Sequence, residues 1–182
     1  NIILDQLYTM NGTDMERQDL AGEAYFMRAF SYFMLANLYG KPYHPATANE
    51  DLCVPLNKEI GLSDKMMKRA TNAAVYAQME EDINKAIQCF KAIGGEKTIF
   101  RPNLPSAYLL ASRIALFQEK YDVTILYCDS VFKVATQPLY KLQEKKDHYF
   151  FSLANKEILL SYGLTSLETH MKEDFRYTGN LV

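Results

Sequence analysis

Tryptophan is absent from this 182-residue chain, and cysteine occurs only three times, at Cys53, Cys89 and Cys128. An odd number of widely spaced cysteines, with no C-x-x-C pair, argues against a disulfide framework and against a zinc site. We expect Cys89 and Cys128 to be small buried apolar residues. The sequence leaves a single disulfide open.

A surplus of charge of one sign is also missing, because 20 basic residues face 22 acidic ones and the net charge is −2. The longest basic cluster, Lys65–Arg69, is too short to follow a phosphate backbone, so no nucleic-acid partner is expected. No segment approaches the roughly 18–20 apolar residues of a membrane span. Residues Asn1–Leu7 lack the basic start and apolar run of a signal peptide. We expect the true N-terminus, with any export signal, to lie outside this sequence.

Catalytic motifs are not found either. There is no G-x-S-x-G, no phosphate loop and no dinucleotide fingerprint, because the glycines fall at the ends of predicted helices. The histidines (His44, His148 and His170) share no helix face, and none has a carboxylate at metal-ligand spacing. The acidic cluster Glu80–Asp82 is typical of a solvated helix face. We therefore expect a protein that is not an enzyme, with no catalytic residue, metal or cofactor.

The most distinctive stretch present is Gly22–Gly40, which is rich in aromatic and aliphatic residues and carries one arginine in its middle. Apolar residues at three- and four-residue spacing predict a helix over Met15–Tyr39, which Thr13 or Asp14 can cap. Gly40 suits the position just past its end. Phe26, Phe30, Phe33 and Met34 extend the apolar character to the other side, which predicts a helix buried between neighbours.

Three further helices are predicted, from Thr71 to about Ile93, over Leu104–Glu119 and over Tyr121–Ala135. The join around Lys120 is so short that the last two should be antiparallel neighbours. A short helix over 147–153 and a strand or extended segment over 157–162 are also expected. The predicted fold class is all-α, with tetratricopeptide-like helical hairpins, long irregular loops and little or no strand.

Arg28 lies within an apolar helix, and a buried guanidinium needs a partner because an unpaired buried charge is very costly. We expect a structural ion pair with a carboxylate of the second long helix, and Asp82 is the first candidate. The alternative role for Arg28 is contact with a ligand.

The segment Lys41–Arg69 has no clear periodicity and is longer than ordinary connections, so it is either functional or ordered by docking on the helices. Proteins that bind carbohydrate stack sugar rings on exposed aromatic residues and hydrogen-bond the hydroxyls with polar side chains. Tyr43, His44 and Asn57 are therefore the candidate ligand-binding residues of this loop. The absence of tryptophan argues against a complete glycan platform within these residues.

Several motifs, in order, resemble those of the SusD/RagB family of Bacteroidetes. The residues that carry the resemblance are Gly22-Glu23-Ala24, Met27-Arg28-Ala29-Phe30, Tyr32-Phe33, Leu38-Tyr39-Gly40-Lys41-Pro42, Tyr76, Asp82-Ile83, Arg101-Pro102, Ala107-Tyr108, Arg113, Tyr140-Lys141-Leu142 and Glu157-Ile158. They span about Leu20–Gly163.

The resemblance implies a single SusD-like helical domain over residues 1–182, as an N-terminal portion of a longer protein or a shortened member. It implies a non-catalytic protein that binds a nutrient, such as a glycan, at the outer-membrane surface and works with a TonB-dependent transporter. The membrane would be reached only through a lipid anchor on the full-length precursor, outside this sequence. The alternative function is a helical-repeat adaptor that mediates protein–protein interaction.

Overall fold

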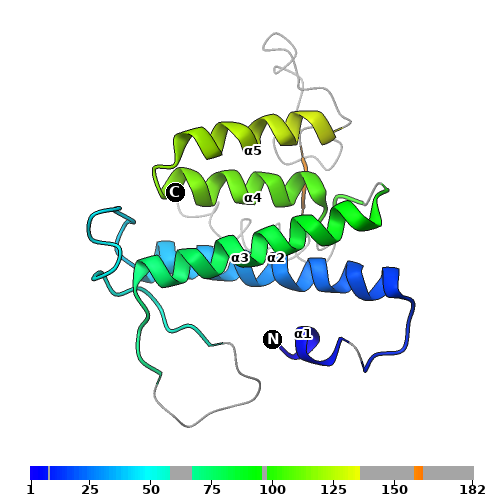
Figure 1. Cartoon of the computed structure of the whole chain (residues 1–182), viewed down its shortest axis with the longest axis horizontal. Helices are drawn as coiled ribbons and strands as arrows, with labels where there is room; N and C mark the ends of the chain where they lie inside the picture. Colours follow the sequence, from blue (N-terminus) through cyan, green and yellow to red (C-terminus); the bar gives the residue numbers. More distant parts are fainter. Residues whose placement is uncertain (8, 58–66, 96–97, 136–157, 162–182) are drawn as a thin grey trace, which may run out of the picture.

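The computed structural model describes residues 1–7, 9–57, 67–95, 98–135 and 158–161, and these residues form five helices (Figure 1). The helices are α1 (Ile2–Gln6), α2 (Asp14–Tyr39), α3 (Asn72–Ile93), α4 (Leu104–Phe117) and α5 (Tyr121–Val134). Within the described ranges the β-structure amounts to one isolated bridge between Leu52 and Thr71. The predicted all-α fold class is confirmed. Among the helices described, none has the length and apolarity to cross a membrane.

The helices stack in chain order. The long helices α2 and α3 lie side by side, α4 packs on α3, and α5 packs on α4 as the outermost layer (Figure 1). The turn between α4 and α5 is three residues long, and its middle residue, Glu119, has a left-handed backbone with φ 63°. Such a short turn makes α4 and α5 an antiparallel hairpin, as the sequence predicted.

Both ends of α2 are fixed by the residues that the sequence indicated. The Thr13 hydroxyl accepts a hydrogen bond from the Glu16 backbone N–H at 3.2 Å, and the Glu16 carboxylate accepts one from the Thr13 N–H at 2.8 Å. This capping box satisfies two backbone donors that the first turn leaves unpaired. At the other end, a Cβ on Gly40 would lie 2.6 Å from the Ala36 carbonyl oxygen and 2.8 Å from Cys53 Sγ, so only glycine fits.

The expectation that α2 is buried around most of its girth is wrong. Its buried residues lie on the side that meets α3 and α4, and they are Ala21, Gly22, Phe26, Ala29, Tyr32, Phe33 and Ala36. Met34, Leu35 and Tyr39 are 44%, 39% and 67% exposed. The periodicity correctly marks apolar positions, but burial depends on which neighbours cover them.

The cysteine expectation is also corrected. Cys53 is fully buried, whereas Cys89 and Cys128 are only half-buried, and all three are free thiols. Cys53 is buried because the loop after α2 folds back on the helices. The short helix expected over 147–153 lies outside the described residues. Of the segment expected over 157–162, residues 158–161 are described and are not helical, and the Ser161 N–H donates to the Ile99 carbonyl at 2.7 Å.

Candidate functional site

The long loop after α2 is ordered by docking, at least over residues 41–57 and 67–71. Its backbone binds the start of α3, because the N–H groups of Asn72 and Ala73 donate to the carbonyls of Asp51 and Ala48, both at 2.8 Å. The two arms of the loop are joined by a hydrogen bond of 2.7 Å from the Cys53 N–H to the Ala70 carbonyl. These contacts hold the loop against the C-terminal end of α2 and create a cavity there.

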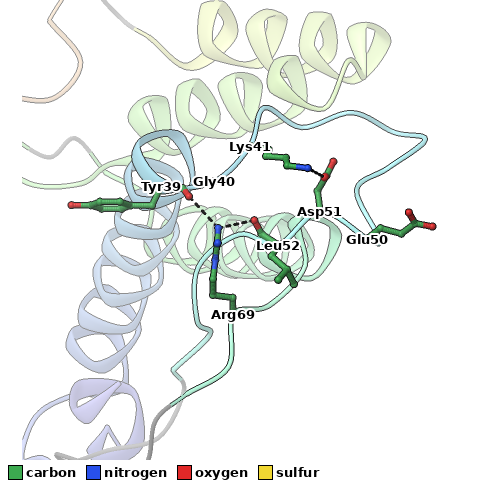
Figure 2. A pocket seen from close by; sticks show the side chains of 7 residues that line it. All are labelled: Tyr39, Gly40, Lys41, Glu50, Asp51, Leu52 and Arg69. Carbon is green, nitrogen blue, oxygen red and sulfur yellow. Dashed lines mark hydrogen bonds and ion pairs between the residues drawn. The ribbon is translucent and has the colours of Figure 1, made fainter.

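The cavity has a volume of about 450 Å³ (Figure 2), within the usual range of small-ligand sites. It is lined by Tyr39, Gly40, Lys41, Glu50, Asp51, Leu52 and Arg69. We call it the Arg69 cavity. Its lining comes from the end of α2, from the first arm of the loop and from the arm that returns to α3.

Arg69 is held firmly by main-chain carbonyls. Its Nη2 donates to the carbonyl oxygens of Leu52 at 2.9 Å and of Tyr39 at 3.3 Å (Figure 2). Its Nε donates to the Cys53 carbonyl. Tyr39 is the last residue of α2, so the guanidinium also lies at the negative end of the helix dipole. Arg69 thus ties the helix end and both arms of the loop together.

An ion pair forms the opposite part of the lining. Lys41 Nζ lies 2.5 Å from Asp51 Oδ1, and the Thr47 hydroxyl donates to Asp51 Oδ2 at 2.6 Å. The hydrogen bond from Lys41, and secondly that from Thr47, hold the pKa of the Asp51 carboxyl below its usual value. Glu50 is exposed at the rim, and the Tyr39 ring points away from the other labelled side chains (Figure 2).

The three ligand-binding candidates named from the sequence lie on the same loop but do not line this cavity. The half-buried Tyr43 ring packs on Tyr76, with centroids 4.7 Å apart. His44 is exposed, and its Nδ1 accepts from the Ala46 N–H at 3.3 Å. The Asn57 N–H donates to the Tyr32 hydroxyl at 3.0 Å. Tyr43 and Asn57 therefore lie against different parts of the helical core.

Sequence reasoning missed Arg69, Lys41 and Asp51. The bonds of Arg69 go to backbone carbonyls, which leave no pattern in the side-chain sequence. The sequence offered only weak signals for these cavity residues: an arginine at the end of the loop, and a lysine and an aspartate ten residues apart within it.

Arg28 and Asp82 are brought together in the core between α2 and α3. Arg28 Nε and Nη2 donate to the two carboxylate oxygens of Asp82 at 2.8 Å and 2.6 Å, and the Gln78 amide donates to the same carboxylate at 3.0 Å. The Asp82 side chain is fully buried and that of Arg28 is 18% exposed. Hydrogen bonding to Asp82 raises the pKa of Arg28.

This bidentate geometry is the strong form of an arginine–carboxylate pair. Arg28 Nη1 also donates to the Asn1 side-chain oxygen at 2.8 Å, which links the start of α1 to α2. The pair is therefore engaged with groups of the protein itself, as a clamp between helices. Elsewhere in the described part of the chain, no group of three His, Cys, Asp or Glu residues could hold a metal ion.

The stacked antiparallel helices, with a long loop docked on their ends, define a tetratricopeptide-like helical scaffold. A family model described as "Starch-binding associating with outer membrane" matches residues 1–116. The chain belongs to this SusD-like family. None of the curated proteins matches it.

Solved structures of SusD-like proteins share the fold. A SusD-like carbohydrate-binding protein from Bacteroides vulgatus is 22% identical with a TM-score of 0.73, and the match covers 88% of this chain and 33% of that protein. A SusD superfamily protein from Bacteroides thetaiotaomicron is 25% identical with a TM-score of 0.71, and the match covers 80% of this chain and 32% of that protein. A laminarin-binding SusD-like protein is 25% identical with a TM-score of 0.59, and the match covers 72% of this chain and 26% of that protein. The matched part of this chain thus spans about a third or less of these proteins.

Proposed function

We propose that this protein captures a nutrient, most simply a glycan, at the outer-membrane surface and does not alter it chemically. The observation that carries the proposal is the family match over residues 1–116, which takes in α2, α3 and the docked loop between them. The naming of similar structures as carbohydrate- or laminarin-binding proteins supports a glycan as ligand. The mixture of charged and polar groups around the Arg69 cavity also suits hydroxyl-rich ligands.

The captured glycan would pass to a TonB-dependent transporter in the outer membrane, with the protein held at the surface by a lipid anchor on its precursor. The family's association with the outer membrane supports this arrangement. Residues 1–182 would form one SusD-like helical domain. Tyr43, His44 and Asn57 remain proposed ligand-binding residues, because they lie on the loop that borders the cavity.

The proposal is tested by titrating the full-length protein with a panel of neutral and acidic oligosaccharides by isothermal calorimetry. Saturable binding of at least one oligosaccharide, with the oligosaccharide recovered intact, is the expected result. Isolation of the protein from outer membranes should also bring down a TonB-dependent transporter. If no oligosaccharide binds and the protein instead forms a stable complex with an unrelated protein, the function is that of a helical-repeat adaptor.

A further inference from the structure

We propose that the Arg69 cavity is a subsite for one uncharged sugar unit. The inference rests on the proposed glycan-binding function and assigns it a place and a class of sugar. Its basis is the charge balance of the cavity, the fixed Arg69 side chain and the residues of the remaining walls.

The charges of the lining side chains cancel. Lys41 and Arg69 contribute two positive charges, and Glu50 and Asp51 contribute two negative charges. A ligand carboxylate would meet the two acidic groups, and a ligand amine would meet the two basic groups. A sugar hydroxyl both donates and accepts hydrogen bonds, so an uncharged sugar satisfies both kinds of group without repulsion.

The donors are fixed before any ligand arrives. Arg69 uses Nε and Nη2 to bind three carbonyls, and Nη1 has no hydrogen-bond partner among the residues that the structure describes. The two N–H groups of Nη1 diverge within the guanidinium plane, so they can donate to two separate hydroxyl oxygens. Because the guanidinium is already ordered, a ligand would lose little free energy in arranging it.

The remaining walls supply an acceptor and an apolar surface. Glu50 is exposed at the rim, and its carboxylate can accept from two hydroxyls. Leu52 is 49% exposed and borders the cavity, where it can contact the C–H groups of a sugar ring. Asp51 is already engaged by Lys41 and Thr47, so it mainly holds Lys41 in position.

The first test substitutes Glu50 and Lys41 in the full-length protein, because both side chains are exposed and neither supports the core. Glu50→Gln and Lys41→Met should each weaken the binding of a neutral oligosaccharide about three- to ten-fold, the effect of losing one hydrogen bond. The matched control is Glu119→Gln, an exposed glutamate in the turn between α4 and α5, which should leave affinity unchanged. Arg69 is not substituted, since its loss would release the loop.

The second test addresses the class of sugar. Glu50→Lys changes the lining charge from zero to plus two, so it should weaken the binding of a neutral oligosaccharide and strengthen that of one containing a uronic acid. The thermal unfolding temperature of the Glu50→Lys variant should equal that of the wild-type protein. A wild-type preference for the acidic oligosaccharide would overturn the assignment of an uncharged sugar.

The outcomes separate the two proposals. If the protein binds a neutral oligosaccharide and the Glu50 and Lys41 variants bind it equally well, the subsite is wrong and the glycan-binding function stands. If the wild-type protein binds no oligosaccharide at all, the glycan-binding function fails and the subsite with it.

Discussion

The Arg28–Asp82 pair makes the sharpest test of what holds α2 to α3. Arg28→Met leaves the Asp82 carboxylate fully buried with only the Gln78 amide as a hydrogen-bond partner among the contacts described above. Removing one partner of a buried ion pair typically costs about 3–5 kcal/mol. Because the Arg28 side chain keeps 18% exposure, we expect a loss at the lower end, about 3 kcal/mol of unfolding free energy.

The assay is urea unfolding followed by far-ultraviolet circular dichroism, with Lys85→Met as the control. Lys85 pairs with Glu81 at 2.6 Å on the surface of α3, where both side chains are at least 42% exposed. Such exposed pairs contribute under about 1 kcal/mol. The double variant Arg28→Met with Asp82→Leu should be more stable than Arg28→Met alone, since it leaves no buried charge.

If Arg28→Met unfolds at the same urea concentration as the wild-type chain, the Arg28–Asp82 pair does not hold α2 to α3. Equal losses of unfolding free energy for Arg28→Met and Lys85→Met would also contradict this role, because the buried and exposed pairs would then contribute equally to stability.

Three further predictions concern other parts of the fold. Gly40→Ala should destabilise the protein by about 1–3 kcal/mol in the same urea assay, because the added Cβ meets the Ala36 carbonyl and Cys53 Sγ; no loss would mean that the loop can move away. Asn103→Ala should lower the unfolding free energy by about 1–2 kcal/mol by removing the cap of α4, whereas Asn103→Asp should keep the cap and lose the amide donor to the Arg101 and Leu159 carbonyls; equal losses for both would contradict the capping role. Burial raises the pKa of Tyr76 to about 12, so the folded state keeps this proton while the unfolded chain loses it near pH 10. Stability should therefore fall by about 2–3 kcal/mol between pH 10 and 12, and Tyr76→Phe should reduce that fall; an identical pH dependence in the variant would refute the shift.

The parts of the fold that depend on local chemistry were predictable. Thr13 and Gly40 mark the ends of α2 because capping and close approach need particular residue types. The pairing of Arg28 with Asp82 followed from the cost of a charge inside an apolar helix.

The parts that depend on distant backbone could not be predicted. Arg69 binds carbonyls 16 to 30 residues away, and any residue can supply a carbonyl. The exposure of Met34 and Leu35 depends on where neighbouring elements pack. The Arg69 cavity depends on this loop docking, so the ligand candidates named from the sequence fell on the correct loop but outside the cavity.

The central claim, that this SusD-like protein captures a glycan through the loop after α2, is tested most directly by one calorimetric titration. The full-length protein and its Glu50→Gln variant are titrated with the neutral oligosaccharide that binds best in the panel. We predict saturable binding to the wild-type protein and binding about three- to ten-fold weaker to the variant. Absence of heat for every oligosaccharide in the panel would contradict the account.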